Sequence, residues 1–265
     1  MAARSALYNV MERAARKAAR GLVHDFGEIE NLQVSVKGPG DFVSTADLQA
    51  ERTLKAELGK ARPGYGFLME EGGATAGDGR HRWIVDPLDG TTNFLHGIPH
   101  FAISIALERE TEIIAGVVYD PMRDEMFYAE KGFGAFVNDR RLRASARPHL
   151  ADAVIGTGIP FRERGDHPEY LKLLGAVMAA TAGVRRMGAA SLDLAYVAAG
   201  RFDGFFEIGL SPWDIAAGML LVREAGGYVS EIGGGRDVLK SGEVMATNDR
   251  LQSPLGKLLR QAKGA

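Results

Sequence analysis

The stretch WIVDPLDGTTNF, residues 83–94, carries the most specific pattern of the chain. It opens with an apolar run typical of a buried strand, which delivers Asp86 at its carboxyl end. Pro87 has no backbone N–H and is expected to stop the strand ladder just before Asp89. Residues 90–92 carry no bulky side chain, so their backbone N–H groups could face an anion where a helix begins.

Two carboxylates at a strand end, beside a turn that can receive an anion, are what a magnesium–phosphate site requires. Asp-Pro and Asp-Gly are also common turn dipeptides, and a lone D-P-x-D would be a turn more often than a metal site. The complete run is much more specific than these parts, and it therefore favours the phosphate site.

Two further acidic stretches lie elsewhere in the chain. Glu70-Glu71 closes the apolar strand GFLM at 66–69 and would place a carboxylate at another strand end. Asp214 opens a strongly apolar helix that begins WDIAAG at 213–218. Taken alone, the first is an ordinary loop acid, and the second is an acid that the dipole stabilises in a first helical turn.

Composition excludes several classes of protein. The chain has 265 residues, 46% hydrophobic and 25% charged, with a net charge of -2, so it is neither disordered nor biased toward nucleic acid or membranes. It has no cysteine, which excludes disulfides, zinc ribbons, iron–sulfur clusters and thiolate catalysis. No run reaches the roughly 18 apolar residues of a membrane span, and a cytoplasmic location is expected. The Arg-rich start reads as a first helix packing on a core rather than as a transit peptide.

The chain is expected to have two layered halves with a soft boundary near residue 150, which could equally count as one domain. Residues 1–150 form an α+β half with the main acidic motif, and residues 151–265 alternate strand and helix as an α/β half that completes the site. The expected helices are 7–22, a helix from the capping box at 44–47 through 58, and then 168–181, 190–199, 213–225 and 248–261. The expected strands are 32–38, 65–69, 82–85, 101–107, 113–119, 124–129, 153–156, 203–208, 227–231 and 243–246, with a hairpin turn at 138–139.

Together the acidic segments resemble the inositol monophosphatase family of magnesium-dependent, lithium-sensitive phosphatases. Both signatures of that family are present without a gap, as WIVDPLDGTTNFLH at 83–96 and WDIAAGMLLVREAGG at 213–227. The likeness extends to 41–47 and to the run at 185–209, which looks most like the bacterial branch when IGTGIPF at 155–161 is included. It implies a five-layer α-β-α-β-α sandwich of the inositol monophosphatase and fructose-1,6-bisphosphatase type, and a homodimer.

The resemblance also implies two or three magnesium ions. Glu70, Asp86 and the carbonyl of Leu88 would hold the first ion, and a second would bind Asp86, Asp89 and Asp214. A third, weaker ion would lie near Glu70. The physical sense is independent of the family, because four carboxylates cannot lie together ionised unless cations neutralise them.

The implied reaction is in-line hydrolysis of a phosphate monoester, with the attacking water oriented by Glu70 and Thr91. Gly90 and Thr91 would present backbone N–H groups to the phosphate. Asp47 would act through Thr91, and Lys37 looks like a flexible charged residue near the metals.

By the same resemblance, four positions would select the alcohol: Asp89, Ala190, Glu207 and Asp214. Carboxylates suit this role because they accept hydrogen bonds from vicinal hydroxyls. Arg185 either approaches the substrate or is a surface or dimer-contact arginine. The expected substrate is myo-inositol-1-phosphate, and fructose-1,6-bisphosphate, histidinol phosphate and 3′-phosphoadenosine 5′-phosphate remain open as alternatives.

A hypothesis of another class is an RNA-binding or transcription-complex partner, because the resemblance to the bacterial branch also implies a role in ribosomal RNA transcription. The supporting feature is the basic run RRLR at 140–143, with Arg147 nearby. The acidic net charge and an absence of stacking aromatic residues favour a solvated basic hairpin instead.

Overall fold

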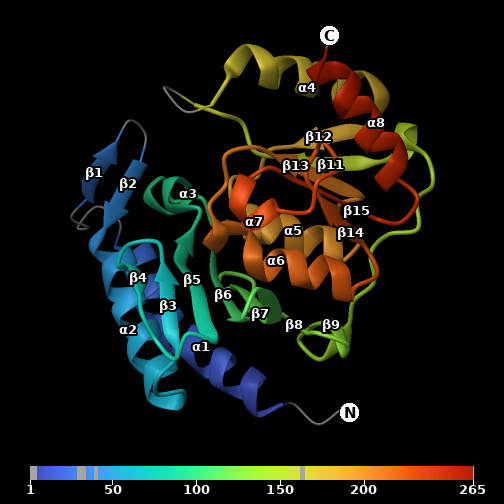
Figure 1. Ribbon diagram of the computed structural model, residues 1–265. Helices are drawn as coiled ribbons and strands as arrows, with labels where there is room; N and C mark the ends of the chain where they lie inside the picture. The colour runs from blue at the N-terminus through green and yellow to red at the C-terminus, as the bar shows by residue number, and fades with distance from the viewer. Residues whose placement is uncertain (1–4, 29–33, 39–40, 162–164, 265) are drawn as a thin grey trace.

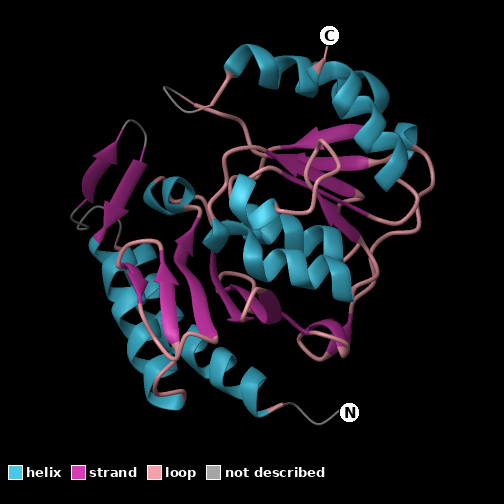
Figure 2. Ribbon diagram, in the orientation of Figure 1, coloured by secondary structure: helices cyan, strands magenta, loops and turns pink. Residues whose placement is uncertain are grey.

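The computed structural model describes residues 5–28, 34–38, 41–161 and 165–264, without the side chains of 34–38 and 41–43. Its elements stack as helices, sheet, helices, sheet and helices, which confirms the expected α-β-α-β-α sandwich (Figure 1). Figure 2 shows the two sheets in magenta, separated by a central pair of cyan helices. Within the described ranges, no helix combines the length and the apolar character of a membrane span.

The helices cover both outer faces of the sandwich and fill its middle (Figure 1). Within the described ranges they are α1 (Ala6–Phe26), α2 (Thr45–Ala61), α3 (Thr91–Leu95), α4 (His167–Ala180), α5 (Ala190–Ala198), α6 (Pro212–Glu224), α7 (Val238–Ser241) and α8 (Gln252–Lys263), with a 3-10 turn at Leu150–Asp152. α1 and α2 pack on the large sheet, α5 and α6 lie between the sheets, and α4 and α8 cover the small sheet.

The large sheet has the strand order β10-β9-β8-β7-β6-β5-β3-β4 and the small sheet the order β12-β11-β13-β15-β14. A separate hairpin joins β1 (Val34–Gly38) and β2 (Asp41–Ser44). The large sheet contains β3 (Gly66–Met69), β4 (Gly73–Thr75), β5 (His81–Asp89), β6 (Ala102–Arg109), β7 (Glu112–Asp120), β8 (Glu125–Glu130), β9 (Gly134–Val137) and β10 (Arg140–Arg141). The small sheet contains β11 (Val154–Thr157), β12 (Gly183–Arg185), β13 (Gly204–Glu207), β14 (Tyr228–Ser230) and β15 (Val244–Thr247).

The start of α2 is the predicted capping box, and it also places a functional side chain. Ser44 Oγ accepts hydrogen bonds from the backbone N–H groups of Ala46 and Asp47, while Asp47 Oδ2 accepts one from Ser44 N at 3.0 Å. These reciprocal bonds satisfy donors that a helix start otherwise leaves unpaired. They also bury Asp47 beneath the turn that follows β5.

The central helices pack very closely, which explains two glycines in apolar surroundings. A Cβ on Gly218 of α6 would lie 2.5 Å from Leu194 Cβ of α5, and a Cβ on Gly116 of β7 would lie 3.0 Å from Ala217 Cα. Only glycine permits such backbone approaches. α6 is therefore pressed against both α5 and the large sheet, and its first turn is fixed relative to the end of β5.

The expectation that Pro87 ends the strand is wrong. β5 continues to Asp89, and its pairing with β6 shifts register between Asp86↔Ser104 and Asp89↔Ala102. The irregularity tolerates the missing N–H of the proline, since a bulge leaves a residue out of the ladder. Both aspartates consequently project from the end of one continuous strand.

Most of the other expected elements are present within a few residues of their predicted bounds. The turn at Asn138-Asp139 is also confirmed, with positive φ angles of 44° and 66° between β9 and β10. The short elements that were not expected from the sequence include β2, β4, β12, α7 and the 3-10 turn at Leu150–Asp152. The division near residue 150 stays a prediction.

Candidate active site

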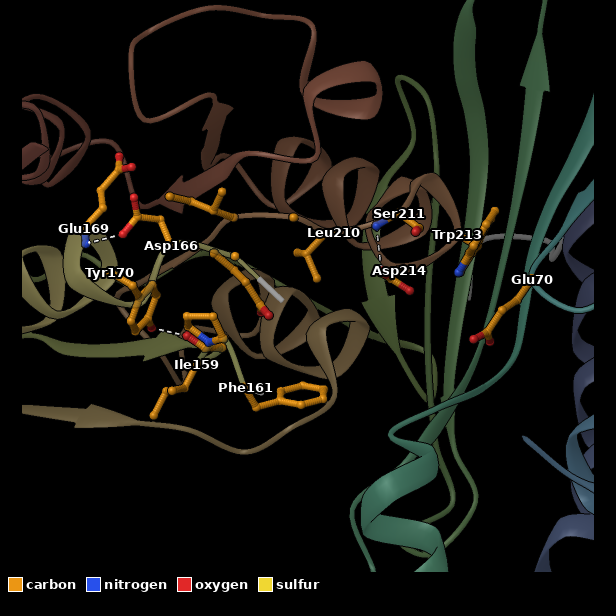
Figure 3. Close-up of a pocket in the computed structure, with 16 residues that line it drawn as sticks. Glu70, Ile159, Phe161, Asp166, Glu169, Tyr170, Leu210, Ser211, Trp213 and Asp214 are labelled. Carbon is orange, nitrogen blue, oxygen red and sulfur yellow. Dashed lines mark hydrogen bonds between the residues drawn. The ribbon is translucent and has the colours of Figure 1, made fainter. Parts of the chain in front are cut away.

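Four acidic side chains from three separate segments meet where β5 ends. Asp86 and Asp89 come from β5, Glu70 follows β3, and Asp214 lies in the first turn of α6. The charges of Glu70, Asp89 and Asp214 all act on Asp86, which is 2% exposed. Figure 3 shows the Glu70 carboxylate directed toward Asp214 at one end of a cavity. The structure thus brings together the acids that the sequence scattered over about 145 positions.

Burial and mutual repulsion disfavour charge on this cluster. Burial raises the pKa of Asp86 well above its ordinary value, and the neighbouring Glu70, Asp89 and Asp214 charges raise it further. Burial likewise raises the pKa of Asp214, with the charge of Asp89 as the next cause. Burial raises the pKa of Asp89 to about 6, against hydrogen bonds that lower it. A cation bound among these carboxylates would favour their ionised form at neutral pH.

One oxygen of each aspartate is held by the protein, and this sets the direction of the carboxylate. Asp86 Oδ1 accepts from Leu88 N at 2.9 Å, and Asp214 Oδ2 accepts from Ser211 N at 2.7 Å. Asp89 Oδ2 accepts from both the N–H and the hydroxyl of Ser191, at 2.7 and 2.5 Å. Among the described residues no three acids or histidines converge as a preformed metal cage, so ions would have to draw the remaining oxygens together.

The donor set fits magnesium rather than a softer metal. All the side chains are carboxylates, and oxygen ligands are those that magnesium prefers. The carbonyl of Leu88 lies beside them and accepts a hydrogen bond from Thr91 Oγ1 at 3.1 Å. The raised pKa values and the all-oxygen donor set both point to a bound cation.

The turn after β5 is shaped by Gly90. Its φ of 95° lies in the left-handed region, and it caps the short helix α3. A Cβ at this position would lie 3.1 Å from His100 O and 3.3 Å from Phe101 Cα. Both constraints select glycine, and they direct the first N–H groups of α3 away from intrahelical acceptors.

The hydroxyl of Thr91 connects this turn to Asp47. Thr91 Oγ1 lies 3.1 Å from Leu88 O and 3.2 Å from Asp47 Oδ1, and its single proton serves both acceptors. Asp47 is completely buried, and that burial raises its pKa, against hydrogen bonds from Ser44 and Thr91 that lower it. The expected link from Asp47 to Thr91 is therefore present in the structure.

A cavity of about 640 Å³ opens beside the acids, toward the small sheet (Figure 3). Its wall combines acidic ends with apolar residues, among them Ile159, Phe161, Leu210 and Trp213. Glu207 at the end of β13 lines it, and a Cβ on Gly158 would lie 1.8 Å from Glu207 Oε1. Only glycine at 158 leaves room for this carboxylate.

A second acid, Asp193, lies near Glu207. Burial raises the pKa of Glu207 to about 8, the charge of Asp89 raises it too, and Arg186 lowers it. Burial raises the pKa of Asp193 well above its ordinary value, and the charge of Glu207 adds to this. Asp193 Oδ1 is buried without a hydrogen-bond partner among the described residues. This end of the cavity is thus acidic, and the charge of Arg186 acts on both Asp193 and Glu207.

The structure places the remaining predicted residues as follows. Ala190 begins α5 and lines the hollow around Asp89 and Gly90, together with Arg186. Arg185 lies on β12 with an exposed side chain, and its Nη1 donates to Val184 O at 2.9 Å. Arg186 rather than Arg185 therefore lines the cavity. The side chain of Lys37 lies outside the described residues.

Sequence reasoning missed four residues of the site: Gly158, Arg186, Ser191 and Asp193. All lie within the runs 155–161 and 185–209 that carry the family likeness, but no local pattern distinguishes them from core residues. The one usable signal was the polar pair Ser191 and Asp193 inside an otherwise apolar helix.

Comparison with known proteins agrees over nearly the whole chain. The sequence model of the inositol monophosphatase family matches residues 3–263. The inositol-1-monophosphatase of Mesorhizobium japonicum is 62% identical over 264 residues, 99% of each chain. The Nus factor SuhB of Pseudomonas aeruginosa is 47% identical over 249 residues, 92% of each chain. The crystal structure of extragenic suppressor protein suhB from Bartonella henselae has a TM-score of 0.94 and 56% identity, covering 97% of this chain and 99% of that one.

Proposed function

The chain belongs to the inositol monophosphatase family and is a phosphoric monoester hydrolase, and from that premise we propose that myo-inositol-1-phosphate is its substrate. One observation carries the proposal: the two acids of β5, the acid that follows β3 and the acid in the first turn of α6 meet beside the Gly90–Thr91 turn. Acids of this kind hold cations, and the turn supplies N–H donors to an anion. The relatives named inositol-1-monophosphatase, at 55–62% identity, support the polyol substrate.

The family is metal dependent, and we assign two or three magnesium ions to this chain. Glu70, Asp86, Asp89, Asp214 and the carbonyl of Leu88 would hold them. Bound magnesium supplies the positive charge that attracts the phosphate and stabilises the charge developing on its oxygens. The carboxylates match this role because their ionised form is otherwise disfavoured by burial.

The residues of the turn bind the phosphate and orient the water. The N–H groups of Gly90 and Thr91, at the start of α3, donate to phosphate oxygens. Thr91 Oγ1 donates its proton to Leu88 O or Asp47 Oδ1, so its lone pairs are left to accept a hydrogen bond from water. Glu70 accepts the second hydrogen bond of that water and aligns it for in-line attack. Asp47 acts by positioning Thr91.

The acidic wall selects the alcohol. Glu207, Asp89 and Asp214 accept hydrogen bonds from ring hydroxyls, and Ala190 leaves space for the ring. Gly158 contributes by allowing Glu207 to pack close to its backbone. Arg186 offsets part of the negative charge at this end of the cavity, and this end can therefore bind the neutral polyol ring of the substrate.

A substrate panel tests the proposal. Purified protein is assayed for phosphate release from myo-inositol-1-phosphate, fructose-1,6-bisphosphate, histidinol phosphate and 3′-phosphoadenosine 5′-phosphate, with magnesium, with chelator, and with magnesium plus lithium. We expect magnesium-dependent release that is fastest on myo-inositol-1-phosphate. Glu207→Ala should reduce kcat/KM for that substrate by about tenfold through loss of a hydrogen bond with a ring hydroxyl. Faster release from another compound would replace the substrate, and no release from folded, metal-loaded protein would contradict the catalytic assignment.

Lithium sensitivity, a homodimer and a cytoplasmic location belong to the same proposal. Family membership supports lithium sensitivity and the homodimer. The assay with magnesium plus lithium tests lithium sensitivity. Sedimentation velocity tests the homodimer, with a single species of twice the chain mass as the expected result.

A second candidate function is participation in a transcription complex, supported by the relatives named Nus factor SuhB at 45–47% identity. The basic run lies on the β9–β10 hairpin, where Arg140, Arg141 and Arg143 are exposed. Contrary to the expectation from sequence, aromatic rings accompany it: Arg141 lies over the Phe136 ring at 5.7 Å, and Phe133 is 74% exposed. Cations beside exposed rings suit single-stranded nucleic acid. Salt-sensitive retention on RNA that is lost in Arg140→Gln/Arg143→Gln would support this candidate, and equal retention would remove it.

A further inference from the structure

A second cavity of about 640 Å³ lies far from the acids, and nothing in the phosphatase reaction uses it. It is formed by the turn between β6 and β7, the last turn of α6, and the segment that carries α7. α6 and α7 lie side by side there (Figure 1). Four cations line it: Arg109, Arg223, Arg236 and Lys240.

This cavity is at the opposite end of the elements that build the active site. Asp89 of β5 pairs with Ala102 at the start of β6, whereas Arg109 at the end of β6 pairs with His81. Along α6, Asp214 and Arg223 are separated by nine residues, about 14 Å of helix axis. The two cavities share no lining residue. A ligand in one would therefore not contact a ligand in the other.

The acids of the second cavity are already bound by cations outside its lining. Glu108 pairs with Arg82 at 2.7 Å, Glu110 pairs with Arg80 at 3.3 Å, and Glu112 pairs with Lys131. The remaining acid, Asp237, is exposed at the start of α7. Together with these outer cations, seven positive groups face four carboxylates, which leaves an excess of three positive charges.

The four lining cations have no such partner. In the part of the chain that the structure describes, Arg109, Arg223, Arg236 and Lys240 make no ion pair and no side-chain hydrogen bond. Glu112 is close enough to act on Arg223, but its carboxylate is bound by Lys131. Like charges gathered in a concave surface raise the local concentration of counter-ions. Unpaired cations around a hollow are the arrangement that anion sites present before their ligand binds.

The floor of the cavity is apolar and rigid. Met219 of α6 and Ile113 of β7 are buried, and Leu239 of α7 packs against the same core. The C-terminal end of α6 carries partial negative charge, which Arg223 in its last turn offsets. The volume lies within the range of small-ligand sites, roughly 300–1,000 Å³. An anion that fills it would contact cations from three separate segments at once.

We propose that this second cavity binds a small anion with at least two phosphate groups, such as the diphosphate part of a nucleotide or of a phosphorylated metabolite. Two groups are needed because the cations come from separate segments: Arg109 ends β6 and Arg223 lies in the last turn of α6, whereas Lys240 lies in α7 and Arg236 two residues before it. A single phosphate would reach fewer of them, and the guanidinium groups favour bidentate contacts to phosphate oxygens.

Calorimetric titration of metal-free protein with pyrophosphate tests the proposal. The protein is stripped of metal, because the active-site acids then repel anions. The chelator is removed by desalting, so that it cannot compete with pyrophosphate for the second cavity. The variant is Arg236→Gln/Lys240→Gln. Its matched control is Arg140→Gln/Arg143→Gln, which loses the same two charges from an exposed hairpin. Arg186→Gln reports on anions bound near the active site. Inorganic phosphate is the single-group ligand.

We expect one pyrophosphate per chain, bound at least tenfold more tightly than inorganic phosphate, with about a tenfold loss in Arg236→Gln/Lys240→Gln and no change in the other two variants. Circular dichroism and magnesium-dependent turnover of the variant should match the wild type, which excludes misfolding. The proposal is overturned by absence of saturable binding, by equal losses in the variant and its hairpin control, by loss in Arg186→Gln, or by equal affinity for the two ligands.

Discussion

The two ends of β5, β6 and α6 carry opposite charges. At one end, Asp86 and Asp89 are buried beside the half-buried Asp214, and removal from water raises the pKa values of all three. At the other end, Arg109 and Arg223 line a hollow without an ion-pair partner among the described residues. The same strands and helix therefore position an excess of negative charge in one cavity and of positive charge in the other.

This difference shows which charged groups selection for stability alone would not favour. A buried acid without a counter-charge destabilises a fold, whereas an exposed cation without a partner costs little. The acidic end is explained by a bound metal, which the fold needs for function. The basic end costs the fold little, and the anion proposed above would give it a function. We therefore expect mutations at the two ends to differ in the size and the sign of their effects on activity and on the free energy of unfolding.

The largest effect is expected at the acidic end. Asp86→Asn should lower kcat for phosphate release by about 10³-fold, because in the proposed mechanism Asp86 would be a ligand shared by two ions. The same change should raise the stability of the metal-free protein by about 1–2 kcal/mol, since it removes a buried charge and leaves an oxygen to accept from Leu88 N. Activity assays and denaturant unfolding without metal measure the two effects. A variant that is inactive and also less stable without metal would contradict this explanation of the cluster.

The turn between the two aspartates and α3 comes next. Gly90→Ala should destabilise the protein by about 2–3 kcal/mol, because alanine is strained at a φ of 95° and its Cβ would approach His100 O to 3.1 Å. Urea unfolding measures the loss. Gly132→Ala is the matched control, with a φ of 80° but no atom within 4 Å of its Cβ, and it should lose less. Equal losses would show that steric contact at the phosphate turn is unimportant.

A pH-dependent effect of intermediate size is expected at His100, close to the same turn. Its ring is 3% exposed, and neither ring nitrogen has a hydrogen-bond partner among the described residues. Burial lowers the pKa of His100 to about 4, with the charge of Arg123 as the next cause. The folded state therefore binds the proton less readily than the unfolded state, where the pKa is about 6.5.

The contribution of neutral His100 to the free energy of unfolding is fully present above pH 6.5. This contribution falls by about 2 kcal/mol as the pH drops toward 4. The measurement is the difference in unfolding free energy between wild type and His100→Gln from pH 7.5 to pH 4.5. Other titrating groups cancel in that difference. A difference that does not change with pH would mean that His100 titrates alike in both states.

The smallest effects are expected at the basic end. Arg236→Gln/Lys240→Gln should leave kcat and KM for the phosphatase substrate unchanged. The free energy of unfolding should stay within about 0.5 kcal/mol of the wild type, as is usual for exposed groups without partners. Steady-state kinetics and thermal unfolding check both values. A loss of activity would show that the two ends are coupled through α6 rather than separate.

The sequence predicts the acidic end far better than the basic end, for a physical reason. The strand–turn–helix run at 83–94 is local, and its periodicity, proline and glycine indicate a strand end and a helix start. Its error concerns Pro87, where pairing with β6 carries the strand to Asp89. That pairing is a tertiary contact, and local propensity does not contain it.

Residues that depend on distant contacts were not predictable in this way. Ser191 orients Asp89 across 102 positions, and Asp193 is polar inside a helix that otherwise reads as core. Among the cations of the second cavity, Arg109 is more than 100 positions before the other three, and ordinary charged turns surround them all. Arg185 and Arg186 are adjacent in sequence, and only the geometry of β12 shows which of them lines the active-site cavity.

The most direct test of the central claim is phosphate release from myo-inositol-1-phosphate by metal-stripped protein, measured as magnesium is added back. We expect no release without metal and a saturable rise in release with magnesium. Asp86→Asn should show no such rise, and Arg236→Gln/Lys240→Gln should show the full rise of the wild type. Release by the metal-free protein at the same rate would contradict the account, because the buried acids would then have no cation to explain them.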